Sequence, residues 1–256
     1  MITAGIDIGS MTTKGAIVAD GRILMTCVRF TGYNAEAAGE KVFRELLDAL
    51  DLEASRVDRV VATGYGRKAA AFAQATVTEI TCHAAGAHHL DPRVRSVIDI
   101  GGQDSKAIAL NPQGKVRDFA MNDKCAAGTG RFLEVMARAM EVDLDAFGVL
   151  SLLSRKPAQI SSTCTVFAES EVISLIAGGE SRENIVAGIH EAVASRVVAM
   201  ARRLGLVAPI MMTGGVAKNA GVVKALENKL GHVIEVSPYA QENGAIGAAL
   251  LAALRI

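Results

Sequence analysis

The chain has 256 residues, half of them hydrophobic, and carries 27 basic and 27 acidic side chains. The balanced charge argues against a polyanionic partner such as nucleic acid, and a chain with no Trp and few other aromatics offers little surface for stacking on bases. No apolar stretch reaches the roughly 18 residues that a membrane span needs, and the start MITAGIDIGS lacks the pattern of a secretory signal. We therefore expect a cytoplasmic protein that binds neither nucleic acid nor membranes.

A strand predicted from residue 2 leads into a segment that occurs twice. Residues 6–18 read IDIGSMTTKGAIV, and residues 98–110 read IDIGGQDSKAIAL. Two copies of a strand, a glycine turn and a second strand predict a duplicated domain whose halves face each other. A single copy would fit a plain β-hairpin equally well. Aligned without a gap, the copies match at Ile6/Ile98, Asp7/Asp99, Ile8/Ile100, Gly9/Gly101 and Lys14/Lys106.

Each copy has the residue types that bind a phosphate and its metal. Glycines let backbone N–H groups approach a phosphate, hydroxyls add donors, and an Asp at a strand end suits water-bridged Mg²⁺. Lys14 and Lys106 could contact phosphates or simply be solvated at a hairpin end, and Gln103 could orient the attacking water. The predicted catalytic residues are Asp7, Asp99 and Gln103. The ATP-binding residues predicted from the two copies are Gly9, Ser10, Thr12, Thr13, Lys14, Gly101, Gly102 and Asp104.

The remaining chain alternates helices and strands in its hydrophobic patterning. A third glycine turn, Thr213-Gly214-Gly215, follows a strand and could accept a nucleoside, so Gly214, Gly215 and Lys218 complete the predicted ATP site. The spacing of His83, His88 and His89 in a partly helical stretch fits no zinc site. Neither a P-loop nor a dinucleotide-binding G-x-G-x-x-G is present. Helices are predicted at 35–51, 126–140, 165–177, 184–204 and 243–254, strands at 57–62 and 232–238, and a strand, turn and helix within 209–221.

Four motifs resemble, in order and spacing, the phosphate, adenosine and connecting motifs of the superfamily of actin, acetate kinase, sugar kinases and heat-shock chaperones. They are GIDIGSMTTKG (5–15), DIGGQDSK (99–106), MTGGVAKN (212–219) and NGAIGAAL (243–250). This resemblance implies an α/β fold of two ribonuclease-H-like domains around a nucleotide cleft. We expect residues 1–95 to form the first domain and residues 96–256 the second, with the C-terminal helix returning to the first.

Two further stretches narrow the resemblance. MNDKCAAGTGRFLEVMA (121–137) and ISSTCTVFAESEVISL (160–175) are similar to the activator ATPases of 2-hydroxyacyl-CoA dehydratases and to the related ATPase subunits of benzoyl-CoA reductase. The family implies a homodimer with one [4Fe–4S] cluster between subunits, ligated here by Cys125 and Cys164. It also implies Mg²⁺ and ATP in each subunit, a reduced ferredoxin or flavodoxin as electron donor, and an iron–sulfur dehydratase as electron acceptor.

The residues around these cysteines are compatible with the implied cluster. A cubane usually takes four thiolates, which two candidates in each of two copies would supply. Both cysteines stand in polar loops and before predicted helices, whose N-termini would favour bound negative charge. The alternative is that both cysteines are structural thiols buried in the core. That structural interpretation is preferred for Cys27, in a strand-like segment, and is also adopted for Cys82, whose neighbour His83 has no further ligand at suitable spacing.

Three other functions fit parts of the sequence. The first is an ATPase subunit of a benzoyl-CoA-reductase-type enzyme. The second is a non-redox kinase of the same fold, although 256 residues leave little room for a domain that binds an acceptor. The third is a non-catalytic, nucleotide-switched interaction module, which would have no use for cysteines at helix starts.

Overall fold

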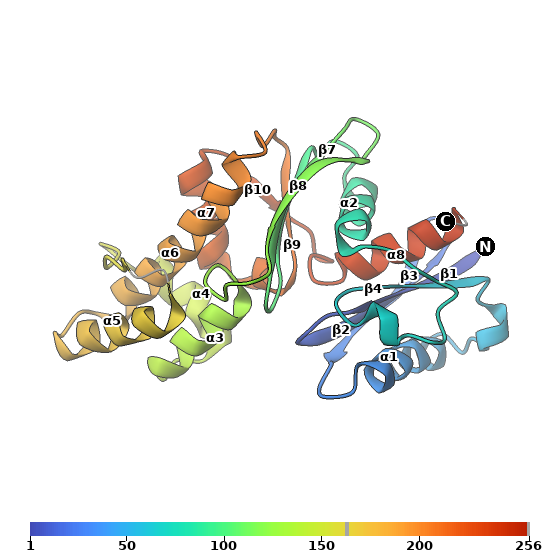
Figure 1. Cartoon of the computed structure of the whole chain (residues 1–256), viewed down its shortest axis with the longest axis horizontal. Helices are drawn as coiled ribbons and strands as arrows, with labels where there is room; N and C mark the ends of the chain where they lie inside the picture. Colours follow the sequence, from blue (N-terminus) through green and yellow to red (C-terminus); the bar gives the residue numbers. More distant parts are fainter. Residues whose placement is uncertain (162–163, 255–256) are drawn as a thin grey trace.

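The two five-stranded sheets of the protein share one topology (Figure 1). The computed structural model describes residues 1–161 and 164–254. The first sheet has the order β3-β2-β1-β4-β5 and the second the order β8-β7-β6-β9-β10. In each sheet three antiparallel strands are extended by two parallel ones. The predicted duplication is therefore confirmed.

The strands of the first sheet are β1 (Ile2–Ile8), β2 (Thr12–Ala19), β3 (Arg22–Phe30), β4 (Arg59–Thr63) and β5 (Ala75–Thr76). Those of the second are β6 (Ser96–Ile100), β7 (Ser105–Leu110), β8 (Val116–Asn122), β9 (Ile210–Thr213) and β10 (Ile234–Val236). The central strands β1 and β6 are buried along almost their whole length, because helices or the neighbouring half cover them. Each ends on its aspartate-bearing turn, and this places the two repeated turns in equivalent positions.

Helices surround both sheets (Figure 1). Helix α1 (Ala35–Ala49) packs on the first sheet through Val42 and Leu46, and Asn34 caps it by accepting a hydrogen bond from the Ala37 amide. A larger core joins the second sheet to the helices that lie between β8 and β10 in the chain. These are α3 (Gly130–Ala139), α4 (Leu144–Leu152), α5 (Thr165–Ala177), α6 (Arg182–Arg202) and α7 (Ala220–Leu230). No helix in the described ranges combines the length and apolarity needed to cross a membrane.

Two helices lie between the sheets and cross each other closely (Figure 1). Helix α2 (Glu79–Leu90) follows β5 of the first sheet but contacts β6, β7 and β8 of the second. Helix α8 (Asn243–Ala253) follows β10 but packs on β1, β2 and β4 of the first sheet. The exchange brings both chain ends into one lobe. The division at residues 95 and 96 stays a prediction, and this arrangement is compatible with it.

Glycines make the helix crossing possible. A Cβ at Gly247 would lie 1.8 Å from the carbonyl oxygen of Cys82, and a Cβ at Gly86 would lie 2.3 Å from the carbonyl oxygen of Asn243. Both distances are shorter than any real contact, so only residues without a side chain allow the two backbones to meet.

We predict that Gly247→Ala destabilises the protein, because the added methyl group would push α8 away from α2. Overpacking of this kind costs about 3 kcal/mol and should lower the melting temperature by roughly 5–10 °C. Thermal unfolding followed by circular dichroism measures the shift. Gly178→Ala is the matched control, since its new Cβ would lie an ordinary 3.4 Å from the Ser174 carbonyl oxygen. Equal melting temperatures for the two variants would contradict the close crossing.

The structure confirms one of the predicted helix boundaries near the cysteines and corrects another. The helix predicted at 165–177 is confirmed as α5, whereas the helix predicted at 126–140 begins only at Gly130. Residues 126–129 form a turn in which the Thr129 hydroxyl donates to the Ala126 carbonyl oxygen at 2.6 Å. Cys125 therefore does not stand at a helix start. Helix α4 was not predicted, because its apolar residues, including the exposed Leu144 and Val149, show no clear one-sided pattern.

Candidate functional site

The two repeated aspartates occupy equivalent buried positions. Asp7 ends β1 beside Lys14 of β2, and the Lys14 ammonium lies 3.2 Å from its carboxylate. Asp99 ends β6 beside Lys106 of β7, at 3.3 Å. On the neighbouring parallel strands, Thr63 of β4 pairs with Asp7 and Thr213 of β9 pairs with Asp99. The duplicated strands thus present one carboxylate, one lysine and one threonine in each half.

A glycine with positive φ stands against each carboxylate. Gly64 has φ +89° and Gly214 has φ +85°, and added Cβ atoms would lie 2.5 Å from Asp7 Oδ1 and 2.9 Å from Asp99 Oδ1. A side chain at either position would be strained and would crowd the aspartate. The predicted nucleoside turn, with Gly214 and the exposed Gly215, therefore begins directly beside Asp99.

Asp99 belongs to a dense network of charges. Lys106 is only 2% exposed. Its ammonium group also contacts Asp104 at 2.7 Å and Glu79 of α2 at 2.8 Å. Burial alone would raise the pKa of Asp99, but its interactions with His83, Lys106 and the Thr213 hydroxyl lower it to about 2. Burial opposes the charge of Lys106, yet Asp99, Glu79 and Asp104 raise the pKa of Lys106. Both side chains are charged at neutral pH, and the Glu79 contact links α2 to the second sheet.

The two glycine turns touch. A Cβ at Gly102 would lie 2.5 Å from Met11 Cγ and 3.7 Å from Ser10 Oγ, so the first turn rests on the second. The amides of Gly9 and Gly101 donate within their own turns, to the carbonyl oxygens of Thr12 and Asp104. These two amides therefore shape the turns.

The other predicted site residues differ in their surroundings. Thr12 is half-buried in the first turn, Gln103 is exposed in the second, and Lys218 is exposed after the nucleoside turn. Thr13 is fully buried, and its hydroxyl pairs with Thr31 Oγ1 at 3.0 Å, which suggests a structural part. The structure thus brings most predicted residues to the facing strand ends and directs Thr13 into the interior.

Sequence reasoning missed Thr213 and His83 as partners of Asp99, Glu79 as a partner of Lys106 and Asn243 as a partner of His83. Thr213 donates to Asp99 Oδ1 at 2.9 Å, and His83 Nδ1 lies 3.4 Å from the same oxygen. A signal for Thr213 was available, since VVATG at 60–64 and IMMTG at 210–214 form a second repeated pair. Glu79 and His83 come from a helix that no repeat identifies.

Cys125 lies in a firmly held loop after β8. The Asn122 side chain accepts from the Cys125 amide at 3.2 Å and donates to its carbonyl oxygen at 2.8 Å. The guanidinium of Arg196, on α6, donates to Cys125 Sγ at 3.7 Å. Cys125 is half-buried against the large core. A thiolate here would have a backbone-fixed position and a cation beside it.

Cys164 is exposed and is the N-cap residue of α5, which packs on α3. Of the polar residues predicted before it, Ser162 and Thr163 lie outside the described residues. Ser161 donates from its amide and hydroxyl to the Glu171 carboxylate at 3.0–3.1 Å. One α5 side chain therefore holds the chain just before Cys164.

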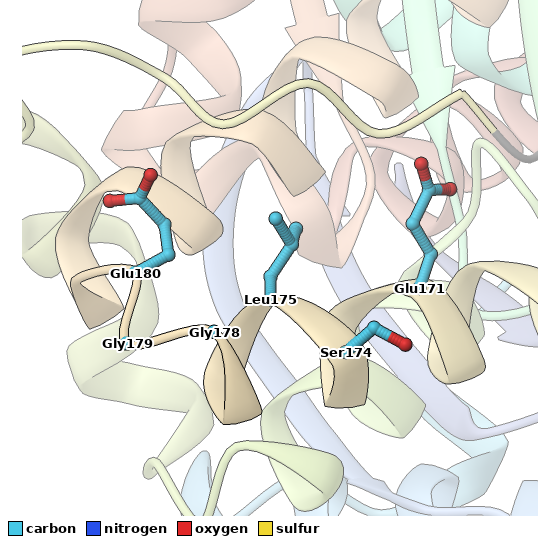
Figure 2. A pocket seen from close by; sticks show the side chains of 6 residues that line it. All are labelled: Glu171, Ser174, Leu175, Gly178, Gly179 and Glu180. Atoms are coloured by element: carbon cyan, nitrogen blue, oxygen red, sulfur yellow. The ribbon is translucent and has the colours of Figure 1, made fainter.

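A groove of about 420 Å³ runs along the second half of α5 to Glu180. In Figure 2 the side chains of Glu171 and Leu175 point to the same side of the helix. Glu180, at the other end of the groove, accepts from Asn184 Nδ2 at 2.9 Å and from the Ser181 amide at 2.8 Å. Both acidic side chains are occupied by neighbouring donors. The residues lining the groove do not include the strand-end aspartates, so it is separate from them.

The other two cysteines have the surroundings of structural thiols. Burial raises the pKa of Cys82, on α2, to about 12, and burial with the Glu45 carboxylate raises the pKa of Cys27 to about 11. Cys82 is fully buried, while Cys27 donates to Glu45 at 3.2 Å. The structural interpretation of both thiols fits these positions. In the described ranges, no three His, Cys, Asp or Glu side chains gather closely enough to hold a metal.

We predict sharply different alkylation rates for the cysteines of the metal-free protein at pH 8. Only roughly one Cys82 thiol in ten thousand would be a thiolate, and the side chain is inaccessible, whereas Cys164 is exposed. Peptide mass spectrometry after brief iodoacetamide treatment should find Cys164 modified first and Cys82 last, and unfolding in urea should abolish the difference. Comparable modification of Cys82 and Cys164 in the folded protein would contradict these environments.

Comparisons with known proteins agree with the fold and with both motif sets. The activator of lactoyl-CoA dehydratase from Anaerotignum propionicum is 47% identical over 98% of this chain and 97% of its own length. The crystal structure of (R)-2-hydroxyglutaryl-CoA dehydratase component A from Acidaminococcus fermentans has a TM-score of 0.96 at 46% identity, covering 100% of this chain and 98% of that one.

The activator of 2-hydroxyisocaproyl-CoA dehydratase from Clostridium difficile, solved with bound ADPNP, has a TM-score of 0.93 at 44% identity, covering 98% and 94% of the two chains. These likenesses confirm the predicted actin-like ATPase fold. Residues 4–252 match a single family description. The chain belongs to the BadF/BadG/BcrA/BcrD ATPase family.

Proposed function

We propose that this chain is an ATP-hydrolysing iron–sulfur activator that delivers a low-potential electron to a 2-hydroxyacyl-CoA dehydratase. The observation that carries the proposal is the presence, on one chain, of a duplicated aspartate site and of two thiols, Cys164 exposed and Cys125 half-buried, in a lobe joined to that site through α3. Relatives named as activators of such dehydratases match this chain over nearly its full length. The proposed place of action is the cytoplasm, where free thiols stay reduced.

On the nucleotide side, Asp7 and Asp99 are the proposed magnesium-binding carboxylates. They fit this role because they are buried, come from opposite halves and end strands on turns that touch. Mg²⁺ held by these carboxylates would neutralise phosphate charge. Lys14 and Lys106 would contact phosphates, Gln103 would orient the attacking water, and the turn at 214–215 with Lys218 would receive the nucleoside. Phosphoryl transfer depends mainly on such positioning and charge stabilisation.

On the electron side, Cys125 and Cys164 are the proposed ligands of a [4Fe–4S] cluster shared by two copies of the chain. The donor set fits: Cys164 is exposed, Cys125 lies at the edge of the core, and both thiols belong to the lobe of α3 and α5. When bound, the cluster would store one electron supplied by a reduced ferredoxin or flavodoxin. Arg196 and the N-terminus of α5 provide positive charge that stabilises thiolates.

A short path along the chain links the two sides. The amides at the start of α3 donate to the second glycine turn, Gly130 to the Gly101 carbonyl oxygen at 2.9 Å and Arg131 to Gly102 at 2.8 Å. Cys125 precedes this helix by five residues. Movement of the turn on ATP binding or hydrolysis would therefore pull on α3 and on the Cys125 loop. This path supports the proposal that nucleotide state controls the exposure of the cluster.

An anaerobic pull-down tests the proposal and separates the alternatives. Tagged protein would be incubated with a lysate of its source organism and either a non-hydrolysable ATP analogue or ADP, and captured proteins would be identified by mass spectrometry. We expect iron–sulfur subunits of a 2-hydroxyacyl-CoA dehydratase, enriched with the ATP analogue. Subunits of a benzoyl-CoA-reductase-type enzyme would favour that alternative instead. Capture of no iron–sulfur acyl-CoA enzyme in either condition would overturn the proposal.

The kinase and switch alternatives have less support. The fold is shared with sugar kinases: a glucokinase from Streptomyces griseus aligns with a TM-score of 0.59 at 15% identity, which speaks for fold alone. Neither alternative assigns a function to Cys125 and Cys164.

A further inference from the structure

His83 connects the two halves of the protein at the nucleotide site. It is 4% exposed and lies in α2, one of the two helices that cross between the sheets (Figure 1). Its Nδ1 atom is 3.1 Å from Thr213 Oγ1 on β9 and 3.4 Å from Asp99 Oδ1 on β6. The side-chain Nδ2 of Asn243, on α8, lies 3.2 Å from the same nitrogen and donates to the His83 carbonyl oxygen at 3.0 Å. Four elements therefore meet at one imidazole.

The duplicated architecture shows that this arrangement is special to one half. At the crossing, Gly86 faces the Asn243 backbone, and Gly247 reciprocally faces the Cys82 backbone. The residue after Cys82 is His83, whereas the residue after Asn243 is Gly244. A Cβ at Gly244 would lie 3.0 Å from His83 Nε2 and 3.2 Å from Asp7 Oδ2. The missing side chain at 244 leaves space for one imidazole, whose two nitrogens face the two aspartate regions.

The two aspartates are consequently held in different ways. Asp99 has Thr213, His83 and Lys106 as partners, with Lys106 also paired to Glu79 of α2. Asp7 has Lys14 as its ion-pair partner, and the hydroxyl of Thr63 makes no hydrogen bond to it. The orientation of the Asp99 carboxylate thus depends on α2, a helix that the other half contributes. A rotation of one lobe about the crossing would move His83 relative to Asp99.

We propose that His83 is a positioning residue for ATP hydrolysis. Through Nδ1 it orients the side chains of Asp99 and Thr213 from across the helix crossing. The metal-binding carboxylate is therefore correctly oriented only in one relative placement of the two halves. The role rests on the proposed ATP hydrolysis. His83 needs no contact with nucleotide for this role. It acts through Asp99, as an outer partner of a metal ligand does, and loss of such a partner typically lowers activity by about 10–100-fold.

Two substitutions of His83 with side chains of similar shape distinguish a positioning role from simple filling of space. His83→Asn keeps a polar atom at the place of Nδ1, whereas His83→Leu fills similar space with no polar atom. We expect His83→Leu to lower the kcat of ATP hydrolysis by about 10–100-fold with the KM for ATP changed less than threefold, and His83→Asn to restore most of the kcat. The readouts are steady-state ATPase kinetics and thermal unfolding, which checks that both variants fold.

His190 supplies the matched control. It is also buried, but it lies on α6 with Nε2 3.3 Å from Asn219 Nδ2 and stacks edge-on against Phe147. His190→Leu should change the melting temperature and leave kcat within about twofold of wild type.

Three outcomes would decide against this role. A wild-type kcat in folded His83→Leu, or equal losses in His83→Leu and His83→Asn, would show that the imidazole only fills space or stabilises the crossing. A wild-type protein that hydrolyses no ATP would overturn the proposed function, and the role of His83 with it. Wild-type hydrolysis with an unchanged His83→Leu variant would overturn only the role of His83.

Discussion

Replacing Asp99 with asparagine is expected to abolish most ATP hydrolysis, with kcat lowered by about 10²–10³-fold. The substitution keeps the shape of the side chain and removes a carboxylate whose pKa of about 2 shows that it is fully ionised at neutral pH. In the proposed mechanism that charge holds Mg²⁺ opposite Asp7. Lys106 would retain Asp104 and Glu79 as ion-pair partners, so the variant should fold.

The measurement is phosphate release under saturating Mg-ATP, with iron content and molecular mass determined on the same preparation. Cluster and dimer should be preserved, because Cys125 and Cys164 do not contact Asp99. Asp118→Asn, a change on the exposed part of β8, is the control and should hydrolyse ATP at the wild-type rate. A wild-type rate in Asp99→Asn would remove Asp99, and with it the symmetry of the two halves, from the proposed catalysis.

Replacing Cys164 with serine is expected to remove the iron–sulfur cluster. Four thiolates are needed for a cubane, and two copies of the chain would lose two of them together. After anaerobic reconstitution, the wild type should contain about four iron and four sulfide per two chains, and Cys164→Ser well under one of each. Cys125→Ala should behave likewise, with weaker dimerisation in both variants.

Cys27→Ala is the matched control, since Cys27 lies in the other lobe and donates to Glu45. It should retain the full cluster. Nucleotide binding by Cys164→Ser should remain close to that of the wild type, because the strand-end aspartates lie in the turns at the other end of the α3 path. Full iron and sulfide in Cys164→Ser, or their loss in Cys27→Ala, would show that the cluster is held differently.

Local repeats and patterns in the sequence predicted much of the fold. Two gap-free copies around Asp7 and Asp99 predicted the duplication, because each copy is a short segment whose residue types allow few structures. The return of the C-terminal helix to the first half was expected from the family resemblance, and α8 packs on β1, β2 and β4. The predicted start of α3 was wrong because Gly128 has φ +90° and Thr129 is the N-cap residue, and the amides that follow donate to the Gly101 and Gly102 carbonyl oxygens.

The interactions between distant segments could not be read from the sequence. Nothing near Glu79 indicates that it pairs with Lys106, because the ion pair requires α2 to cross from the first half onto the second sheet. His83 was considered only as a metal ligand, since its neighbours Thr213 and Asn243 lie more than a hundred residues away in the chain. Arg196 and Cys125 are likewise far apart in the chain, by 71 residues. Each of these contacts follows from helix placement.

Nucleotide-dependent activation of a dehydratase tests the central claim most directly. The reconstituted protein would be reduced anaerobically and mixed with the purified dehydratase that it captures, and formation of the unsaturated acyl-CoA product would be followed. We predict product only when the chain, a low-potential reductant and ATP are all present, and none when ATP is replaced by ADP or a non-hydrolysable analogue, or when Asp99→Asn replaces the wild type. Equal product formation with ADP, or an inactive dehydratase in the presence of cluster-loaded, ATP-hydrolysing protein, would contradict the proposed function.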